Sequence, residues 1–275
     1  MTYLTAKRLL ELDLRLAERD REITQTVARL RLVSGIQLER LFFTHGGLPA
    51  TRARLARGAL ARLTDLGLLA RLQRPVGGVR GGSGAWVYEV GPAGERLLAY
   101  WRGEGISRPR PAHEPGQRFV AHTLAISETY ARLVEADREQ RIELLTFDAE
   151  PASWRRFVGI GGRDVILKPD AVVRLGSGPF EDSWWLEVDL ATESSTVLKR
   201  QCEAYLRYQR TGREQHEHGV FPRVLWTVPD KRRGELLERT IGSLPATARE
   251  LFVITLDACL VDVLAAVSIA SEATS

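Results

Sequence analysis

Two neighbouring apolar runs in the second half of the chain constrain its fold most. Residues 165–175 (VILKPDAVVRL) and 184–190 (WWLEVDL) are rich in β-branched and aromatic residues, and the segment GSGPFEDS between them is typical of a turn. The two runs predict neighbouring strands of a hairpin. Because side chains alternate across a strand, Trp184 should enter the core, whereas Glu187 and Asp189 should share the opposite face.

Carboxylates occur on both of these predicted strands. Asp170 lies on the first strand, and if the strands pair around the turn, Asp170, Glu187 and Asp189 converge. Carboxylates packed this closely repel one another unless a cation lies between them. An oxygen-rich cluster of this kind suits Mg²⁺, which prefers carboxylates together with water and phosphate. The pattern therefore predicts a magnesium site at Asp170, Glu187 and Asp189.

The rest of the second half predicts an α/β layer structure. The apolar spacing indicates further strands and covering helices: a helix over 118–136, strands over 142–148, 223–228 and 251–256, and helices over 196–208 and 234–241. The preceding segment RGEGISRPRPAHEPGQ contains three prolines and no periodicity, as an exposed connector does. We therefore expect two domains, residues 1–110 and 111–275.

The charge of the chain is unevenly distributed between these domains. Residues 1–110 contain 19 Lys and Arg against 10 Asp and Glu, a net charge of +9, whereas the remainder contains 20 against 25, a net charge of −5. A basic module joined to an acidic one is typical of a protein that binds a polyanion through one part. A general preference for arginine in the composition is the alternative explanation.

The first domain shows the pattern of a winged helix-turn-helix. Ile23, Val27 and Leu30 have helical spacing, and Ser34 with Gln37 forms the capping box of a second helix. A third helix over 51–69 follows. Two extended runs around a glycine-rich tip then predict a basic hairpin, the wing. The fold class expected for the whole chain is α/β with an N-terminal winged helix-turn-helix.

The third helix is the expected reader of double-stranded DNA. Leu55, Ala59 and Leu63 form an apolar stripe, and Arg54 and Arg57 project from the opposite face, where they would meet the major groove. The full predicted set of DNA-contacting residues is Arg52, Arg54, Arg57 and Arg62 on the helix and Arg74 and Arg80 on the wing. Alternatively, this domain makes only protein contacts and its arginines are solvated.

The second domain resembles the restriction-endonuclease-like PD-(D/E)xK superfamily. The resemblance rests on Pro169-Asp170 on one strand and Glu187-Val188-Asp189 on the next, followed by a helix. It implies a mixed sheet flanked by helices and catalytic carboxylates at Asp170, Glu187 and Asp189. The superfamily has a lysine where this chain has Asp189. Lys199 on the following helix is the candidate replacement, and an ion pair with Glu203 is its alternative role.

Over about residues 10 to 240 the chain resembles the replication-relaxation family of bacterial plasmids and other mobile elements. The matching segments are LAERDREITQTVARLRLVSGIQLERLFF, AHTLAISE, KPDAVV and WLEVDLATESSTVLKRQCEAYLRY. The resemblance implies a DNA-binding protein of plasmid replication, with an enzymatic activity that is poorly defined. Other replication or mobilisation proteins are expected partners, and a homodimer is one expected arrangement.

Three hypotheses follow for the function. The first is a DNA-binding protein of a mobile element, the second a Mg²⁺-dependent endonuclease or nickase, and the third a winged-helix transcription regulator. No apolar run approaches the roughly 18 residues that span a bilayer, so no membrane partner is expected. Two cysteines cannot form a disulfide framework, which favours the cytoplasm.

Overall fold

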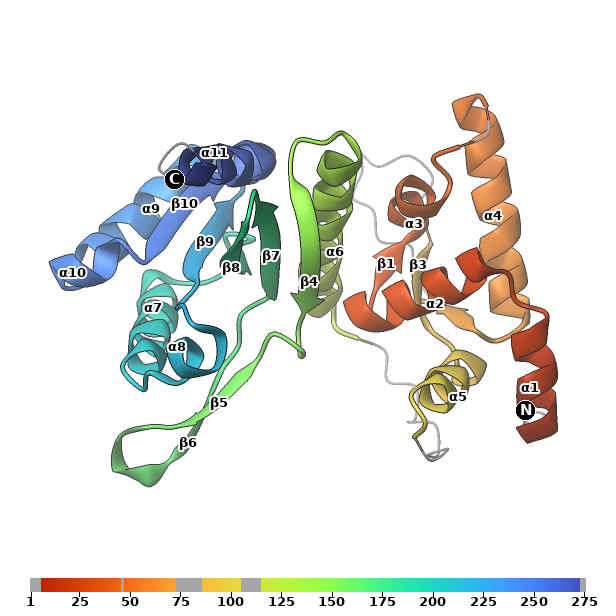
Figure 1. Ribbon diagram of the computed structural model, residues 1–275, viewed down its shortest axis with the longest axis horizontal. Helices are drawn as coiled ribbons and strands as arrows, with labels where there is room; N and C mark the ends of the chain where they lie inside the picture. The colour runs from red at the N-terminus through yellow and green to blue at the C-terminus, as the bar shows by residue number, and fades with distance from the viewer. Residues whose placement is uncertain (1–5, 46, 73–85, 105–114, 273–275) are drawn as a thin grey trace. The chain divides into compact units, whose positions relative to one another are not determined.

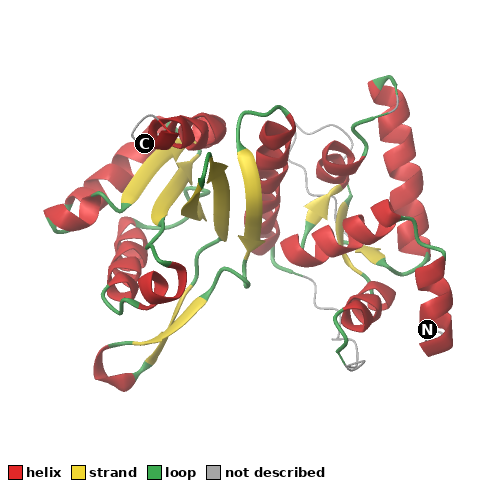
Figure 2. Cartoon of the chain, in the orientation of Figure 1, coloured by secondary structure: helices red, strands yellow, loops and turns green. Residues whose placement is uncertain are grey.

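The computed structural model describes residues 6–45, 47–72, 86–104 and 115–272 (Figure 1). The chain divides into two compact units, residues 1–131 and 132–275. The division falls within α6 (Gln117–Arg138), which supplies residues to both units. Each unit has its own sheet, as Figure 2 shows in yellow, and is described by itself below.

The first unit consists of helices around a small antiparallel sheet. Its helices, apart from the first part of α6, are α1 (Ala6–Leu14), α2 (Glu18–Leu30), α3 (Gly35–Phe42), α4 (Pro49–Asp65) and α5 (Pro92–Trp101). Its strands are β1 (Val33–Ser34), β2 (Leu69–Arg71) and β3 (Val87–Val90), in the order β1-β3-β2. This sequence of elements agrees with the predicted helix order, with α1 as a lead-in and α5 as an addition that the sequence analysis missed.

Local sequence signals in this unit are confirmed. Ile23, Val27 and Leu30 are buried on the inner face of α2. The hydroxyl of Ser34 accepts a hydrogen bond from the backbone nitrogen of Gln37 at 3.3 Å, and the side chain of Gln37 accepts one from the nitrogen of Ser34 at 2.9 Å. The capping box therefore starts α3 as predicted.

One detail of the predicted burial in this unit is wrong. Leu55 is 45 % exposed, because α4 turns Ala56, Leu60 and Leu63 inward together with Ala59. Ala59 and Leu63 are buried as predicted, and Ala56 and Leu60 take the place of Leu55 in the stripe. Val87 and Tyr88 are consecutive in β3 and both buried, which shows that this short sheet is covered on both faces.

The first part of α6 covers one face of the three-stranded sheet. Val120 packs with Leu32, Leu72 and Val87, and the hydroxyl of Ser127 donates a hydrogen bond to the carbonyl of Leu32 at 2.6 Å. These contacts explain why the first unit extends to residue 131. The domain boundary predicted from the sequence, after residue 110, lies before the division at residue 131. The sequence prediction assigned the whole of this helix to the second domain.

The second unit is a mixed sheet with flanking helices. Its five strands are β4 (Glu143–Ala149), β7 (Ala171–Ser177), β8 (Phe180–Val188), β9 (Arg223–Val228) and β10 (Phe252–Leu256), in the order β10-β9-β8-β7-β4. Strands β4, β7 and β8 are antiparallel, and β8, β9 and β10 are parallel. The predicted α/β class is confirmed.

Helices connect the parallel strands of this sheet. They are α7 (Ser195–Gln209) and α8 (Arg213–His218) before β9, α9 (Lys231–Gly242) and α10 (Ala246–Arg249) before β10, and α11 (Leu260–Glu272) after it. A separate pair, β5 (Arg155–Val158) and β6 (Asp164–Leu167), extends away from the five-stranded sheet of this unit (Figure 1). Short 3₁₀ turns lie at Ile160–Gly162 and Asp257–Cys259.

The structure corrects the two central strands in two respects. The single strand predicted over 165–175 is two strands, β6 and β7, because Lys168, Pro169 and Asp170 interrupt the pairing and proline cannot donate a ladder hydrogen bond. Trp184 and Trp185 are consecutive and both fully buried. The strand β8 is therefore covered on both faces, and the face that carries the carboxylates is closed by helices.

Candidate functional site

The outer face of α4 carries two arginines that the fold does not use. Arg54 and Arg57 are exposed, and they make no hydrogen bond or ion pair with the part of the chain that the structure describes. The helix begins at Pro49, whose fixed φ suits the first helical position. Its opposite face is anchored by Ala56, Leu60 and Leu63. This arrangement holds the two guanidinium groups on a rigid helix, available to a ligand.

Other arginines of the predicted DNA-contacting set have structural partners. Arg62 lies 2.6 Å from the carboxylate of Asp20, which is almost completely buried and also accepts a hydrogen bond from the backbone nitrogen of Ala17. A guanidinium nitrogen of Arg52 lies 3.5 Å from the carbonyl of Thr44. Arg62 thus stabilises the packing of α4 against α2. Arg74 and Arg80 lie outside the described residues.

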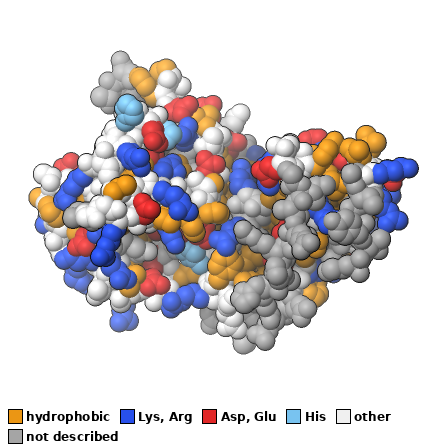
Figure 3. Space-filling model, turned by 90° about the horizontal axis from the view of Figure 1, so that it is seen from below, with side chains coloured by type: hydrophobic (Ala, Val, Ile, Leu, Met, Phe, Trp, Pro, Cys, Tyr) orange, Lys and Arg blue, Asp and Glu red, His pale blue; other side chains and the backbone are white. Residues whose placement is uncertain are grey.

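Exposure alone does not identify a DNA contact on this protein. Figure 3 shows Lys and Arg side chains interspersed with acidic side chains over the face that is seen from below. Basic groups in such mixed surroundings are common on soluble proteins. What distinguishes Arg54 and Arg57 is their position three residues apart on one helix, where they share a face and have no acidic partner among the described residues.

In the second unit, Asp170 is fixed beside the end of β8. Its backbone nitrogen donates to the carbonyl of Leu186 at 3.1 Å, and its carboxylate oxygen Oδ2 accepts from the nitrogen of Val188 at 2.7 Å. Since these bonds span residue 187 of the neighbouring strand, Asp170 and Glu187 lie close together. Both carboxyl groups are buried.

The environment of Glu187 favours its protonated form. Burial raises the pKa of this carboxyl well above its ordinary value, and the nearby charge of Asp170 raises it further. The hydroxyl of Tyr205 on α7 donates a hydrogen bond to Oε1 of Glu187, which opposes this shift. Burial and the charge of Glu187 raise the pKa of Tyr205 in turn. The two groups form a buried polar pair within the core between α7 and the sheet.

Asp189 is engaged by a cation of the protein itself. Its carboxylate forms a two-pronged ion pair with Arg233 of α9, in which Nη2 donates to Oδ1 at 2.9 Å and Nε donates to Oδ2. The nitrogen of Ala191 also donates to Oδ1, at 2.8 Å. Within the described ranges, no three His, Cys, Asp or Glu side chains are grouped so that they could hold a metal ion. Burial, and then the charges of Asp170 and Asp189, raise the pKa of Glu187, so the three carboxyl groups predicted to converge lie near one another. Within the described structure, the carboxylate of Asp189 is bound by Arg233.

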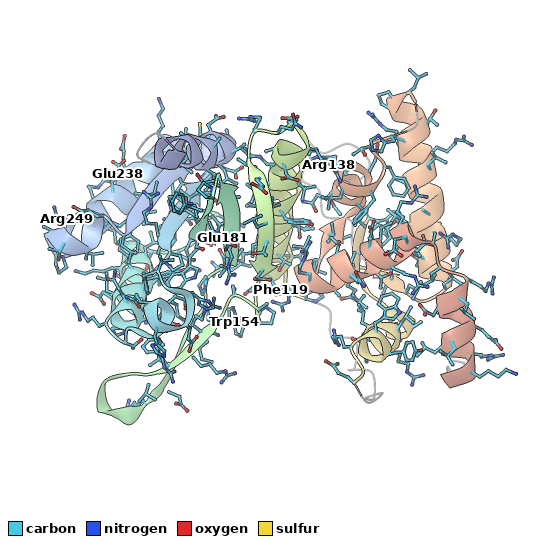
Figure 4. All side chains as sticks on the ribbon, in the orientation of Figure 1. Phe119, Arg138, Trp154, Glu181, Glu238 and Arg249 are labelled. Carbon is cyan, nitrogen blue, oxygen red and sulfur yellow. The ribbon has the colours of Figure 1, made fainter. Side chains whose placement is uncertain are left out.

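Lys199 and Lys168 have different surroundings. Lys199 is exposed on α7, whereas Leu198, Cys202 and Tyr205 of the same helix face the sheet. The ammonium group of Lys168 lies 4.6 Å from the ring centre of Trp154, which Figure 4 labels.

Three residues with buried polar contacts were not predicted from the sequence: Arg233, Tyr205 and a further buried carboxylate, Glu214. Glu214 accepts hydrogen bonds from Arg155 at 3.0 Å and from Tyr208 at 2.7 Å. A signal for Arg233 exists only in retrospect. It is an arginine in the first turn of a helix, after Asp230, whose carboxylate accepts a bond from the nitrogen of Arg233 at 2.8 Å. Nothing local marks it as the partner of Asp189.

Comparison with known proteins identifies the family. No helix among the described residues has the length and apolar character needed to cross a membrane. No curated protein and no solved structure matches the chain. The sequence model of the family described as replication-relaxation matches residues 25–224, which is most of the chain. The chain belongs to the replication-relaxation family.

Proposed function

We propose that the protein binds double-stranded DNA and acts in the replication or processing of plasmid or other mobile-element DNA. Its first unit is a winged helix-turn-helix in which α4 is the recognition helix. The order α2, β1, α3, α4, β2, β3 supports this assignment, and membership of the replication-relaxation family supports the biological role. The single observation that carries the proposal is the exposed pair Arg54 and Arg57 on α4, which has no hydrogen-bond or ion-pair partner among the described residues.

The physical basis of binding is electrostatic. The net charge of +9 on residues 1–110 attracts a polyanion, and arginines on a helix in the major groove contact phosphates or bases. Each phosphate contact releases a counterion, so affinity falls as salt rises, with a logarithmic slope of about −0.9 per contact. Loss of two contacts should therefore reduce the slope by about 1.8.

The test is the salt dependence of duplex binding by the full chain. The variant Arg54→Ala with Arg57→Ala is expected to bind more weakly than the wild type and with a shallower salt slope. The matched control is Arg210→Ala with Arg239→Ala, which removes the same charge from exposed positions of the second unit. Equal affinity of wild type and the α4 variant, or an equal loss in both variants, would show that α4 does not read DNA.

A second candidate function is a metal-dependent endonuclease or nickase. The observation in its favour is the pair Asp170, the residue before β7, and Glu187 on the neighbouring strand β8 of a mixed sheet. Mg²⁺ would be bound by these two residues and, after release from Arg233, by Asp189; Lys199 is exposed and would have to move to take part. When bound, the metal ion would activate water and neutralise charge on phosphate.

Plasmid nicking tests this second candidate. Nicking of supercoiled plasmid in Mg²⁺ or Mn²⁺ should occur with the wild type and vanish in Asp170→Asn. The control Glu181→Gln changes an exposed carboxylate of the same strand pair, labelled in Figure 4, and should nick like the wild type. Absence of nicking by the wild type with either metal, or nicking that survives Asp170→Asn, would exclude it.

A further inference from the structure

The ion pair between Asp189 and Arg233 takes up both oxygens of the carboxylate. Oδ1 accepts from Nη2 of Arg233 and from the nitrogen of Ala191, and Oδ2 accepts from Nε of Arg233. The side chains of Asp189 and Arg233 are 3 % and 7 % exposed, so water does not compete with this pair. Mg²⁺ binds carboxylate oxygens directly and keeps several waters. Both oxygens of Asp189 are already bonded, and its side chain is almost completely buried.

Arg233 is itself fixed from three directions. Its Nη1 donates to the carbonyl of Glu193 at 2.8 Å, in the loop between β8 and α7. Its backbone nitrogen donates to the carboxylate of Asp230 at 2.8 Å, which caps the start of α9. The guanidinium therefore joins the end of β8, the following loop and the first turn of α9. This is the connecting role that a structural metal ion has in other proteins.

The loop around Asp189 is shaped for this internal cation. Ala191 has a φ of +58°, in the left-handed region that non-glycine residues avoid. This conformation directs its backbone nitrogen to Oδ1 of Asp189. The nitrogen of Asp189 donates to the carbonyl of Thr227 at 3.0 Å, which ties the loop to β9. A local strain of this kind persists only where the surrounding contacts stabilise it.

We propose that the guanidinium of Arg233 is the permanent counterion of the Asp189 carboxylate, and that it excludes divalent metal ions from Asp189. Arg233 thus supplies the positive charge that a metal ion would supply in a metal-dependent nuclease. Displacement of Arg233 would leave a buried guanidinium without its partner, which is strongly unfavourable. The inference is independent of DNA binding by α4, and it predicts that the second unit does not use the metal-dependent chemistry of the second candidate function.

The test measures binding of Mn²⁺ alone to the full chain, by electron paramagnetic resonance of the free ion and by the shift in Tm. The wild type is expected to show neither binding nor a shift at millimolar Mn²⁺. Arg233→Met retains the bulk of the side chain and removes its charge. It is expected to have a lower Tm in the absence of metal, to bind Mn²⁺, and to regain Tm when Mn²⁺ is added.

Two further variants assign the site. Asp189→Asn combined with Arg233→Met should lose the Mn²⁺ binding that Arg233→Met gains, because the freed carboxylate is then absent. Arg239→Met, an exposed arginine of the same helix, should behave like the wild type. Neither readout involves DNA, so these results are independent of the α4 proposal.

Two outcomes would overturn the inference. One is Mn²⁺ binding by the wild type that is lost in Asp189→Asn, since the centre would then be open to metal in the presence of Arg233. The other is a folded Arg233→Met variant that binds no Mn²⁺. If Arg233→Met does not fold, Arg233→Lys replaces it. An ammonium group cannot bond both oxygens of Asp189 as the planar guanidinium does, so this variant should bind Mn²⁺ where the wild type does not, and no gain would equally overturn the inference.

Discussion

The hydroxyl of Tyr205 on α7 donates a hydrogen bond to the carboxyl group of Glu187 on β8, and both side chains are buried. The bond connects the helix that covers the sheet to the central strand of that sheet. Burial and the charge of Asp170 raise the pKa of Glu187 well above 4.5. Folding therefore increases the affinity of this carboxyl group for a proton, and the stability of the second unit depends on pH.

The first prediction concerns the sign of this dependence. Because the pKa of Glu187 is higher in the folded than in the unfolded chain, its contribution to stability is fully present below the unfolded value of 4.5 and is lost as pH rises through the folded value. Glu187→Gln does not titrate. Between about pH 5 and about pH 8, the free energy of unfolding should fall less in Glu187→Gln than in the wild type.

Denaturant unfolding at a series of pH values measures this difference. The control is Glu181→Gln, which removes an exposed carboxylate of the same strand and should retain the pH dependence of the wild type. Parallel profiles for wild type and Glu187→Gln would mean that Glu187 is ionised in the folded protein.

The second prediction concerns the two free cysteines. Burial raises the pKa of the Cys202 thiol to about 12, with a further contribution from the charge of Glu187, whereas Cys259 is partly exposed. The thiolate is the reactive form. At about pH 8, a thiol reagent should modify Cys259 quickly and Cys202 only as the second unit unfolds, and denaturant should merge the two rates. Rapid modification of both thiols in the native protein would contradict the burial of Cys202. The variant Cys202→Ala should lack the slow phase of modification and so assigns that phase to Cys202.

Signals confined to a few residues could be predicted from the sequence. The capping box of Ser34 and Gln37 depends on residues three apart, and the apolar stripe of Ile23, Val27 and Leu30 depends only on helical periodicity. The strands β7 and β8 could be predicted because runs of β-branched and aromatic residues are also a local signal. Helix α5 was missed, because Gly94 in its first turn lowers its helix propensity. Gly91 and Gly94 allow the start of α5 to approach the backbone of Gly67 and Leu68, a tertiary contact that the local pattern does not show.

The candidate site depends on distant pairs and was only half predictable. Alternation placed Glu187 of β8 and Asp189, the residue after this strand, on one face, and in the structure they contact Tyr205 of α7 and Arg233 of α9. Alternation cannot specify what covers that face. The partner of Asp189 lies 44 residues away, and the partner of Asp20 lies 42 residues away. The ion pairs Asp189–Arg233 and Asp20–Arg62 therefore could be identified only from the structure.

The third prediction compares two glycines in helices of the first unit. A Cβ atom on Gly94 of α5 would lie 2.3 Å from the carbonyl oxygen of Leu68, whereas one on Gly58 of α4 would have no atom within 4 Å. Gly94→Ala should lower the free energy of unfolding by about 1–3 kcal/mol, because the helix must move away from β2. Gly58→Ala should raise it by about 0.5–1 kcal/mol through helix propensity. Denaturant unfolding measures both, and equal effects would show that α5 does not approach β2 this closely.

The last prediction separates the two roles of the arginines on α4. Arg62→Ala leaves the buried carboxylate of Asp20 without its ion-pair partner and should lower the free energy of unfolding by about 1–3 kcal/mol. Arg57→Ala removes an exposed side chain without a described partner and should change stability by less than about 0.5 kcal/mol. For the affinity for duplex DNA, we expect Arg57→Ala to have the larger effect. At a temperature where both variants are folded, Arg57→Ala should bind more weakly than the wild type, and Arg62→Ala should bind like the wild type. An equal loss of affinity in folded Arg62→Ala and in Arg57→Ala would contradict this prediction. Arg62 would then contact DNA, as the sequence alone predicts, while it also bonds Asp20.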